Sequence, residues 1–506
     1  MADDGASLLE VLRDRLGIRS PKDGCSPQGQ CGCCTVLVDG QPRVACVTPA
    51  RRVQGRAITT LDGLEPEARE RWGEAFCATG ASQCGFCTPG IVVRLEGLAA
   101  KKPDAGTAEV ERALQAHLCR CTGWRTILDA WELATSGEVP GGLAGRDPEA
   151  AGRRAEIEGH TVQSVSPAVA WGAGGFADDT SPADALVAVP DGEGDWVVAE
   201  TLTEARRLAG KVQGRRTTVE PEPPIELPAG EWALTLRTSW IEPAYLETDA
   251  SWCEPGGEPV TPLANGGAFG GKLTSPAPDS ARLLADRHGR AVRVVLSRED
   301  TVRLGPKRPP IAAGVRADGT GVVRVARTPG IAEAIRSVAP SLEIDEIDIA
   351  GPPTSASVRA AGWAEAAVLL AALDPEGPVS VSAPAGGTAT AEVADDGEIR
   401  VRVTCGEPLD DVVLRSYCVG AAHMALGWVT SEGLAVDADG EVHDLTVRSF
   451  GIPRAVDTPS IVVEVEAGDG PPVNGSDAVF AAVAAAVWRH QGLPGQWPTG
   501  QTVRVR

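Results

Sequence analysis

Residues 24–46 read GCSPQGQCGCCTVLVDGQPRVAC, and the spacing of their cysteines is that of metal ligands. Cys31 and Cys34 form a C-x-x-C pair, which puts two thiols on one side of a tight turn. Glycines between the cysteines let backbone N–H groups turn toward the sulfurs, which stabilises a negatively charged metal–sulfur group. This pattern predicts a [2Fe–2S] cluster, and the expected ligands are Cys25, Cys31, Cys34 and Cys46.

The loop resembles the binding loop of plant-type ferredoxins, with one residue more between Cys25 and Cys31. Cys33 leaves an alternative open, because it could replace a neighbour if the register of the loop differs.

A second group of four cysteines lies in QCGFCTPG, residues 83–90, and HLCRCTGW, residues 117–124. Each pair precedes a predicted helix, so two positive helix N-termini would face one anionic cluster. A four-cysteine zinc site is the alternative, although C-x-C is less usual for zinc. We expect a second [2Fe–2S] cluster, held by Cys84, Cys87, Cys119 and Cys121. Cys77 fits neither group and is expected to be a small buried residue.

Composition limits the possible functions. All of the 13 cysteines except Cys253, Cys405 and Cys418 lie between Cys25 and Cys121, so the metal chemistry is N-terminal. The net charge of −22 argues against a nucleic-acid partner. We see neither a signal peptide nor an apolar run long enough for a transmembrane segment, and we expect a cytoplasmic protein. A chain of 506 residues predicts several domains.

The periodicity of the sequence predicts the local elements. Residues 7–17 read as a capped helix, and Asp39-Gly40 marks a β-hairpin whose second strand would carry Cys46. Gly- and Ala-rich residues 136–164 read as a flexible linker, and beyond them short strands alternate with helices. Four further helices are expected at residues 67–79, 90–99, 107–118 and 126–134.

Together the cysteine motifs resemble the iron–sulfur region of the xanthine dehydrogenase and aldehyde oxidoreductase family of molybdenum hydroxylases. The resemblance spans nearly all of residues 7–134. It implies an α+β multidomain protein in which a β-grasp ferredoxin-like domain, residues 1–62, precedes a four-helix [2Fe–2S] domain, residues 63–135. In the family, the residues that match Gln83 and Cys121 lie against the pterin of a molybdenum cofactor.

The resemblance continues in fragments, which implies a hammerhead-like small domain at residues 165–235 and a reduced, α/β molybdopterin-binding-like region at residues 236–506. NGGAFGGK, residues 265–272, resembles the glycine loop that runs beside the cofactor, where only glycine permits close backbone approach. By itself it could be a glycine turn before a helix. The cofactor-binding residues implied are Gln83, Gly266, Gly267, Ala268, Phe269, Gly270 and Gly271.

Two catalytic residues are implied in the same way. Arg359, in SVRAAGWAEA, resembles the arginine that approaches cofactor and substrate, and Asp477 stands where relatives carry a glutamate base. Asp477 also precedes an Ala-rich helix, where it could serve as an N-cap instead.

The function expected is therefore that of a molybdenum hydroxylase. Such an enzyme oxidises an aldehyde or an N-heteroaromatic compound with oxygen from water, and passes electrons through two [2Fe–2S] clusters. We expect a molybdopterin-type molybdenum cofactor, no FAD in this chain, a small-molecule substrate, a separate electron acceptor such as a flavoprotein subunit, and an oligomer. The alternative is a non-catalytic electron-transfer subunit whose C-terminal part is a scaffold.

Overall fold

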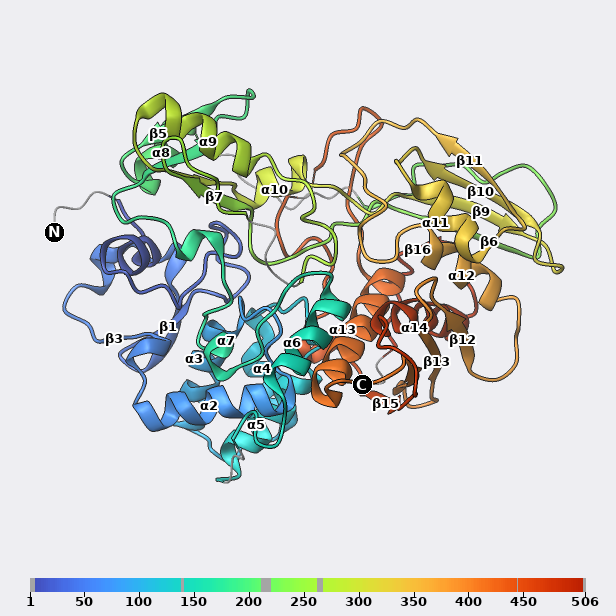
Figure 1. The fold of residues 1–506 in the computed structure, drawn as a ribbon, viewed down its shortest axis with the longest axis horizontal. Helices are drawn as coiled ribbons and strands as arrows, with labels where there is room; N and C mark the ends of the chain where they lie inside the picture. The colour runs from blue at the N-terminus through green and yellow to red at the C-terminus, as the bar shows by residue number, and fades with distance from the viewer. Residues whose placement is uncertain (1–4, 138–140, 211–219, 262–266, 444, 504–506) are drawn as a thin grey trace.

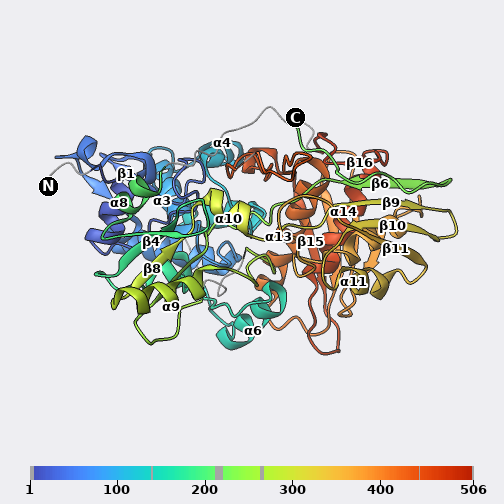
Figure 2. The same cartoon turned by 90° about the horizontal axis from the view of Figure 1, so that it is seen from above.

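The computed structural model describes residues 5–137, 141–210, 220–261, 267–443 and 445–503. It is a mixed α/β multidomain structure in which the N-terminal third forms one side and the C-terminal sheets form the other (Figure 1). Helix α13, Asp411–Thr430, lies between these halves when the molecule is seen from above (Figure 2).

The first unit is a short helix followed by a small antiparallel sheet. Ser7 caps the helix by accepting from Glu10 N at 3.1 Å, and the second part of the helix is a π-turn, Val11–Arg15. The predicted hairpin forms, with Asp39 and Gly40 both at positive φ in its turn. The elements are α1 Leu8–Glu10, β1 Thr35–Val38, β2 Gln41–Val44 and β3 Ile58–Thr59, in the sheet order β2-β1-β3.

The expectation that Cys46 lies on the second strand is wrong. Strand β2 ends at Val44, and Cys46 lies in the 3₁₀ turn Ala45–Val47. The chain turns there because Ala45 N donates to Cys34 O at 3.1 Å, which brings Cys46 back over the cysteine loop.

Four helices follow, close to the predicted bounds. Pro66 opens the first of them, and Gly80 at φ +69° ends it. They are α2 Pro66–Thr79, α3 Thr88–Ala99, α4 Thr107–Ala113 and α5 Arg125–Thr135. Helix α4 is shorter than expected, because its last turn becomes the 3₁₀ segment Leu114–Ala116.

The predicted flexible linker contains a packed helix, α6 Pro148–Gly159. Asp147 caps it, and Arg154 and Glu158 on it are completely buried. Composition suggested flexibility, but the contacts that fix this helix come from residues more than 250 positions away. The short helix α7 Pro167–Ala170 follows.

A four-stranded sheet of order β5-β4-β8-β7 forms the next unit, with helices α8 and α9 packed against it. Because β7 and β8 lie beyond residue 235, the predicted boundary between residues 235 and 236 cuts through this sheet and is wrong. Sequence order hid the pairing of β4 with the distant strand β8. The elements are β4 Leu186–Pro190, β5 Trp196–Ala199, α8 Leu202–Ala209, β7 Ala250–Cys253, α9 Ala277–His288, β8 Val292–Val295 and α10 Arg298–Leu304.

Two further sheets make up the C-terminal half. The first has the order β11-β10-β9-β6-β16, and the second has the order β12-β13-β14-β15. Their strands are β6 Leu234–Thr238, β9 Ile311–Val315, β10 Gly321–Ala326, β11 Leu342–Ile347, β16 Gln496–Trp497, β12 Val379–Ser382, β13 Thr388–Val393, β14 Ile399–Thr404 and β15 Ile461–Glu466. The accompanying helices are α11 Ile331–Val338, α12 Trp363–Ala371 and α14 Ser476–His490.

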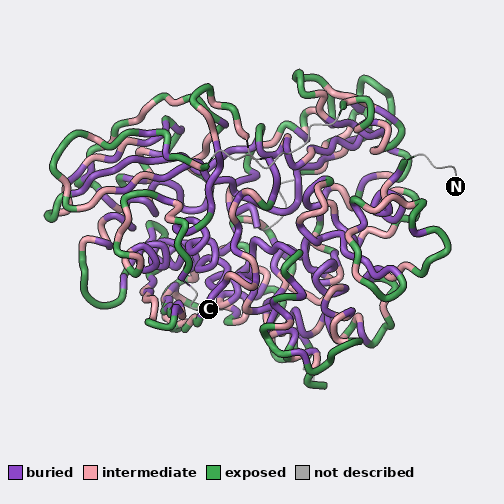
Figure 3. The backbone as a smooth tube through the Cα atoms, turned by 180° about the vertical axis from the view of Figure 1, so that it is seen from behind, coloured by how far each residue is buried: buried purple, intermediate pink, exposed green. Residues whose placement is uncertain are grey.

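Helices α13 and α14 pack together as the core of this half. Trp428 stacks on Phe480 with ring centroids 5.0 Å apart. Among the described helices, α13 alone is long and apolar enough to cross a membrane, yet 89% of its apolar window is buried inside the protein. Buried backbone fills the centre of the molecule, and exposed loops form its rim (Figure 3).

Candidate functional site

The first group of cysteines gathers in the loop before β1 and in the turn after β2. All members are buried. The Cys25 thiol lies within hydrogen-bonding reach of Cys31 and Cys46, and these contacts hold its pKa well below the ordinary value. Cys46 also faces Cys34, whose Sγ accepts from Cys46 N at 3.4 Å. The structure therefore brings together the four residues chosen from spacing, which we call the first set.

Cys33 takes a different position. Its Sγ points to Cys31 O at 3.9 Å, and the thiol it reaches is that of Cys31. The thiols that lie within hydrogen-bonding reach of Cys25 are those of Cys31 and Cys46, and those within reach of Cys46 are Cys25 and Cys34. This geometry favours Cys34 over Cys33 as the ligand.

The second group, which we call the second set, gathers between the loop that precedes α3 and the loop that precedes α5. Cys84 Sγ lies 3.6 Å from Cys121 Sγ, and Cys87 lies within hydrogen-bonding reach of Cys119. The contact with Cys87 lowers the pKa of the Cys119 thiol to about 6, so that this sulfur is readily a thiolate.

The pairing of the thiols bears on the kind of metal group. Each iron of a [2Fe–2S] cluster takes two cysteines, whereas structural zinc takes four ligands around one ion. The pairs Cys84–Cys121 and Cys87–Cys119 therefore fit a two-iron cluster better than zinc.

A backbone hydrogen bond joins the two sets. Leu118 N, next to Cys119, donates to Cys31 O at 3.0 Å. The loops approach so closely that a Cβ on Gly32 would lie 2.5 Å from the His117 ring, and one on Gly90 would lie 2.3 Å from Gly32 O. Glycine at these positions is what permits the contact.

The C-terminal half forms a wall of the second set. Gln83 Nε2 donates to Cys121 O and to Ser416 Oγ, both at 3.0 Å. A Cβ on Gly267 would lie 3.0 Å from Cys121 Sγ, so this end of the glycine loop lies directly against the cysteine. Gly266 lies outside the described residues. Beyond Gly267 the loop leaves the cysteines, since Gly270 lies against Ser357 and Gly271 against Pro243.

Arg359 and Asp477, both proposed to be catalytic, are bonded to each other. Arg359 Nε donates to Asp477 Oδ1 at 3.0 Å, and Arg359 Nη2 donates to Ser476 Oγ at 2.5 Å. The guanidinium also lies 4.2 Å from the centre of the Phe269 ring. The second carboxylate oxygen of Asp477 is 3.2 Å from His160 Nε2. Burial raises the pKa of Asp477, but His160 and Arg359 outweigh it and hold this pKa below its ordinary value.

Asp477 does not cap the helix, whose N-cap residue is Gly475, and this excludes the cap as the alternative role of Asp477. It lies inside α14, and its carboxylate faces Arg359 and His160. The first turn of α14 is satisfied instead by Glu158 of α6, which accepts from Gly475 N at 3.1 Å and from Ser476 N at 2.8 Å. Asn474 Oδ1 accepts from Asp477 N at 2.9 Å.

A small cavity of about 20 Å³ lies beside the second set, lined in part by Gln83, Ser416 and Tyr417. The Oε1 atom of Gln83 and the hydroxyl of Tyr417 are buried without partners. The space suits a single water molecule, which these two polar atoms would bind. This cavity is too small for a molybdopterin. Arg359 and Asp477, which lie outside its lining, form an ion pair with each other.

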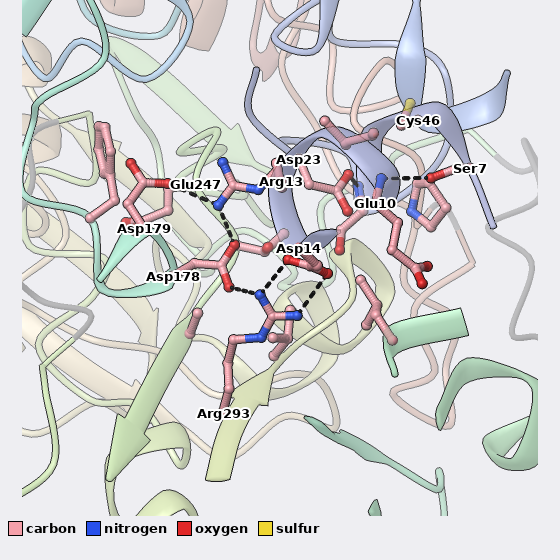
Figure 4. Close-up of a pocket in the computed structure, with 18 of the residues that line it drawn as sticks. Ser7, Glu10, Arg13, Asp14, Asp23, Cys46, Asp178, Asp179, Glu247 and Arg293 are labelled. Atoms are coloured by element: carbon pink, nitrogen blue, oxygen red, sulfur yellow. Dashed lines mark hydrogen bonds and ion pairs between the residues drawn. The ribbon is translucent and has the colours of Figure 1, made fainter. Parts of the chain in front are cut away.

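An ionic cluster lies beside the first set and joins the N-terminal helix to the small sheet domain (Figure 4). Arg13 donates to Asp178 at 2.6 Å and to Asp179 at 2.8 Å. Arg293 of β8 bonds Asp14 through both terminal nitrogens at 3.0 Å. Burial raises the pKa of Asp178, but Arg293 and Arg13 outweigh it and hold this pKa well below its usual range.

Sequence reasoning missed His160, Glu158 and the Leu118 link. His160 and Glu158 meet their partners across more than 300 positions of chain, and no local pattern marks them. The Leu118 contact had a weak indication in the sequence, because Leu118 precedes the predicted ligand Cys119 and its acceptor, Cys31, is also a predicted ligand.

The fold and the two cysteine sets define an iron–sulfur protein of mixed α/β architecture. Residues 60–132 match the [2Fe-2S] binding domain family. The chain is 39% identical over 121 residues to the nicotinate dehydrogenase small FeS subunit of Eubacterium barkeri, covering 24% of this chain and 76% of that subunit. It is 42% identical over 132 residues to the aldehyde oxidoreductase of Megalodesulfovibrio gigas, covering 25% of this chain but only 14% of that protein.

The structure of the aldehyde oxidoreductase from Desulfovibrio gigas matches with a TM-score of 0.71 and 15% identity, over 98% of this chain and 97% of that one. This likeness shows the fold of the whole chain, including the C-terminal half. The chain belongs to the xanthine dehydrogenase and aldehyde oxidoreductase family of molybdenum hydroxylases.

Proposed function

We propose that this chain is an iron–sulfur electron-transfer protein, and that its C-terminal half is a scaffold rather than a molybdenum site. The observation that carries the proposal is the mutual bonding of Arg359 and Asp477, which leaves neither free for a cofactor or substrate. A general base works best with a pKa near the operating pH, and the pKa of Asp477 is shifted the other way.

Two [2Fe–2S] clusters would be held by the first and second sets, one by each. When bound, such clusters exchange single electrons without moving atoms of a substrate. The chain itself supplies a short connection between the sets, because Cys119 and Cys31 are linked through the Leu118 N–H to Cys31 O hydrogen bond at 3.0 Å. We further propose a separate electron acceptor, in keeping with the relative that is named as a subunit.

Hydroxylation of an aldehyde or N-heteroaromatic substrate is the second candidate. It is favoured by the contact of the glycine loop with Cys121 and by the match in fold to an aldehyde oxidoreductase. A molybdenum cofactor would then have to open the Arg359–Asp477 contact.

Elemental analysis of protein purified anaerobically from its native host separates these candidates. We expect about four irons per chain, with matching acid-labile sulfide and neither molybdenum nor pterin. One molybdenum and one pterin per chain would replace the proposal with the hydroxylase. Zinc without iron would end both.

A further inference from the structure

Arg120 stands between the second-set ligands Cys119 and Cys121, and its guanidinium is buried against the C-terminal half. Its Nη1 and Nη2 donate to the two carboxylate oxygens of Glu432 at 2.6 and 2.9 Å. Its Nε donates to Pro243 O at 3.0 Å. The two side chains are 4% and 2% exposed. The pair is thus a bidentate contact from which water is excluded.

Helix α13 is shaped to place this carboxylate. A Cβ on Gly427 would lie 2.2 Å from Glu432 Oε1, so glycine is needed for Glu432 to fold back at the end of the helix. About two turns earlier, a Cβ on Gly420 would lie 1.7 Å from Cys121 O. The same face of α13 therefore contacts both a ligand residue and the partner of Arg120.

Charges in such an interior are weakly screened and act on their neighbours. Reduction adds a negative charge to an iron–sulfur cluster, so a nearby cation favours reduction and a nearby carboxylate opposes it. Arg120 and Glu432 therefore have opposite effects on the reduction potential of a nearby cluster.

We propose that Glu432, acting through Arg120, is a positioning residue that holds the second set and lowers the reduction potential of the cluster bound there. This inference rests on the proposed function, because it requires a cluster in the second set. It gives the C-terminal half a task in electron transfer that needs no molybdenum.

The test is Glu432→Gln, which removes the charge and keeps the shape of the side chain. Midpoint potentials are measured by redox titration with electron paramagnetic resonance detection, and the signal lost in Cys84→Ser identifies the second cluster. We expect the second potential to shift upward and the first to stay unchanged. Glu432→Asp, which keeps the charge, should shift the second potential less.

Glu365→Gln is the matched control. Glu365 accepts from Arg308 at 2.6 and 2.9 Å, with both side chains buried, in a pair assigned to neither cysteine set. It should leave both potentials unchanged. Equal shifts in the Glu432 and Glu365 variants, or no shift in Glu432→Gln, would overturn the inference.

Loss of the second signal from both Glu432 variants would also overturn the role in setting the potential, and would reduce Glu432 to a structural support. Wild-type protein without iron would instead reject the proposed function itself, so the two failures are distinguishable.

Discussion

The N-terminal third and the C-terminal half have kept different things from their family. The N-terminal third retains both sequence similarity and the buried cysteine sets, whereas the C-terminal half is matched through its fold, in a structural likeness that has 15% identity over 98% of the chain. In the N-terminal third, the cysteines of the family motifs lie close together. In the C-terminal half, Arg359 and Asp477 are bonded to each other. A fold survives such change because apolar packing tolerates substitution, but a site needs particular groups left free to act.

For the N-terminal third, the sharpest test compares Cys31→Ser with Cys33→Ser. Cys31→Ser should abolish the electron paramagnetic resonance signal of the first cluster, because a [2Fe–2S] centre needs its four thiolates. Cys33→Ser should keep the electron paramagnetic resonance signals of both clusters. Cys33 reaches the Cys31 thiol but is not one of the four cysteines of the first set. The reverse result would move the ligand register by one residue.

Glu158→Ala tests the packing of helix α6 against α14 in the C-terminal half. Glu158 is completely buried, bonds Arg154 at 2.9 Å and accepts from the first N–H groups of α14. The change leaves the buried Arg154 charge without its carboxylate, so we expect a loss of ~3–5 kcal/mol in the free energy of unfolding. Urea denaturation measures it, and the exposed Glu149→Ala on the same helix is the control. A loss below ~1 kcal/mol, the worth of an exposed pair, would contradict a closed network.

Asp477→Ala and Asp477→Asn ask whether the Arg359 pair is structural or catalytic. A structural pair predicts that alanine costs ~1.5–3 kcal/mol of stability, the usual worth of hydrogen bonds to a charged group, and that asparagine costs less. Thermal unfolding with iron analysis checks both. If aldehyde turnover exists and falls by ~10²–10⁴ in each variant while stability is unchanged, Asp477 is a general base after all.

The smallest effect concerns His160 and pH. Its bond to Asp477 raises the pKa of His160 above the ordinary value of 6.5. A raised pKa means that the stabilisation is fully present below about pH 6.5 and is lost as the pH rises through the higher, folded-state value. The wild-type protein should therefore lose a little stability over that window, and His160→Gln should show a flatter profile. If stability depends on pH with the same slope in the variant and in the wild type, the contact between His160 and Asp477 makes no pH-dependent contribution to stability.

Much of the N-terminal third could be predicted because its signals are local. The hairpin follows from Asp39-Gly40, the helices from their period, and both cysteine sets from spacing within short loops. Prediction failed where the partner was distant. Helix α6 was read as a linker because its buried Arg154 is satisfied by Pro408 and Val473, which no window around residue 154 contains.

The amino-acid sequence by itself determined the metal chemistry, because thiols in C-x-x-C and C-x-C spacing have few other uses in one short segment. It also determined the family, through motifs in a fixed order. Only the tertiary structure showed that Arg359 and Asp477 are bonded to each other. Whether Arg359 faces a ligand or Asp477 depends on how α6, α12 and α14 pack, and that packing is set by contacts between residues hundreds of positions apart.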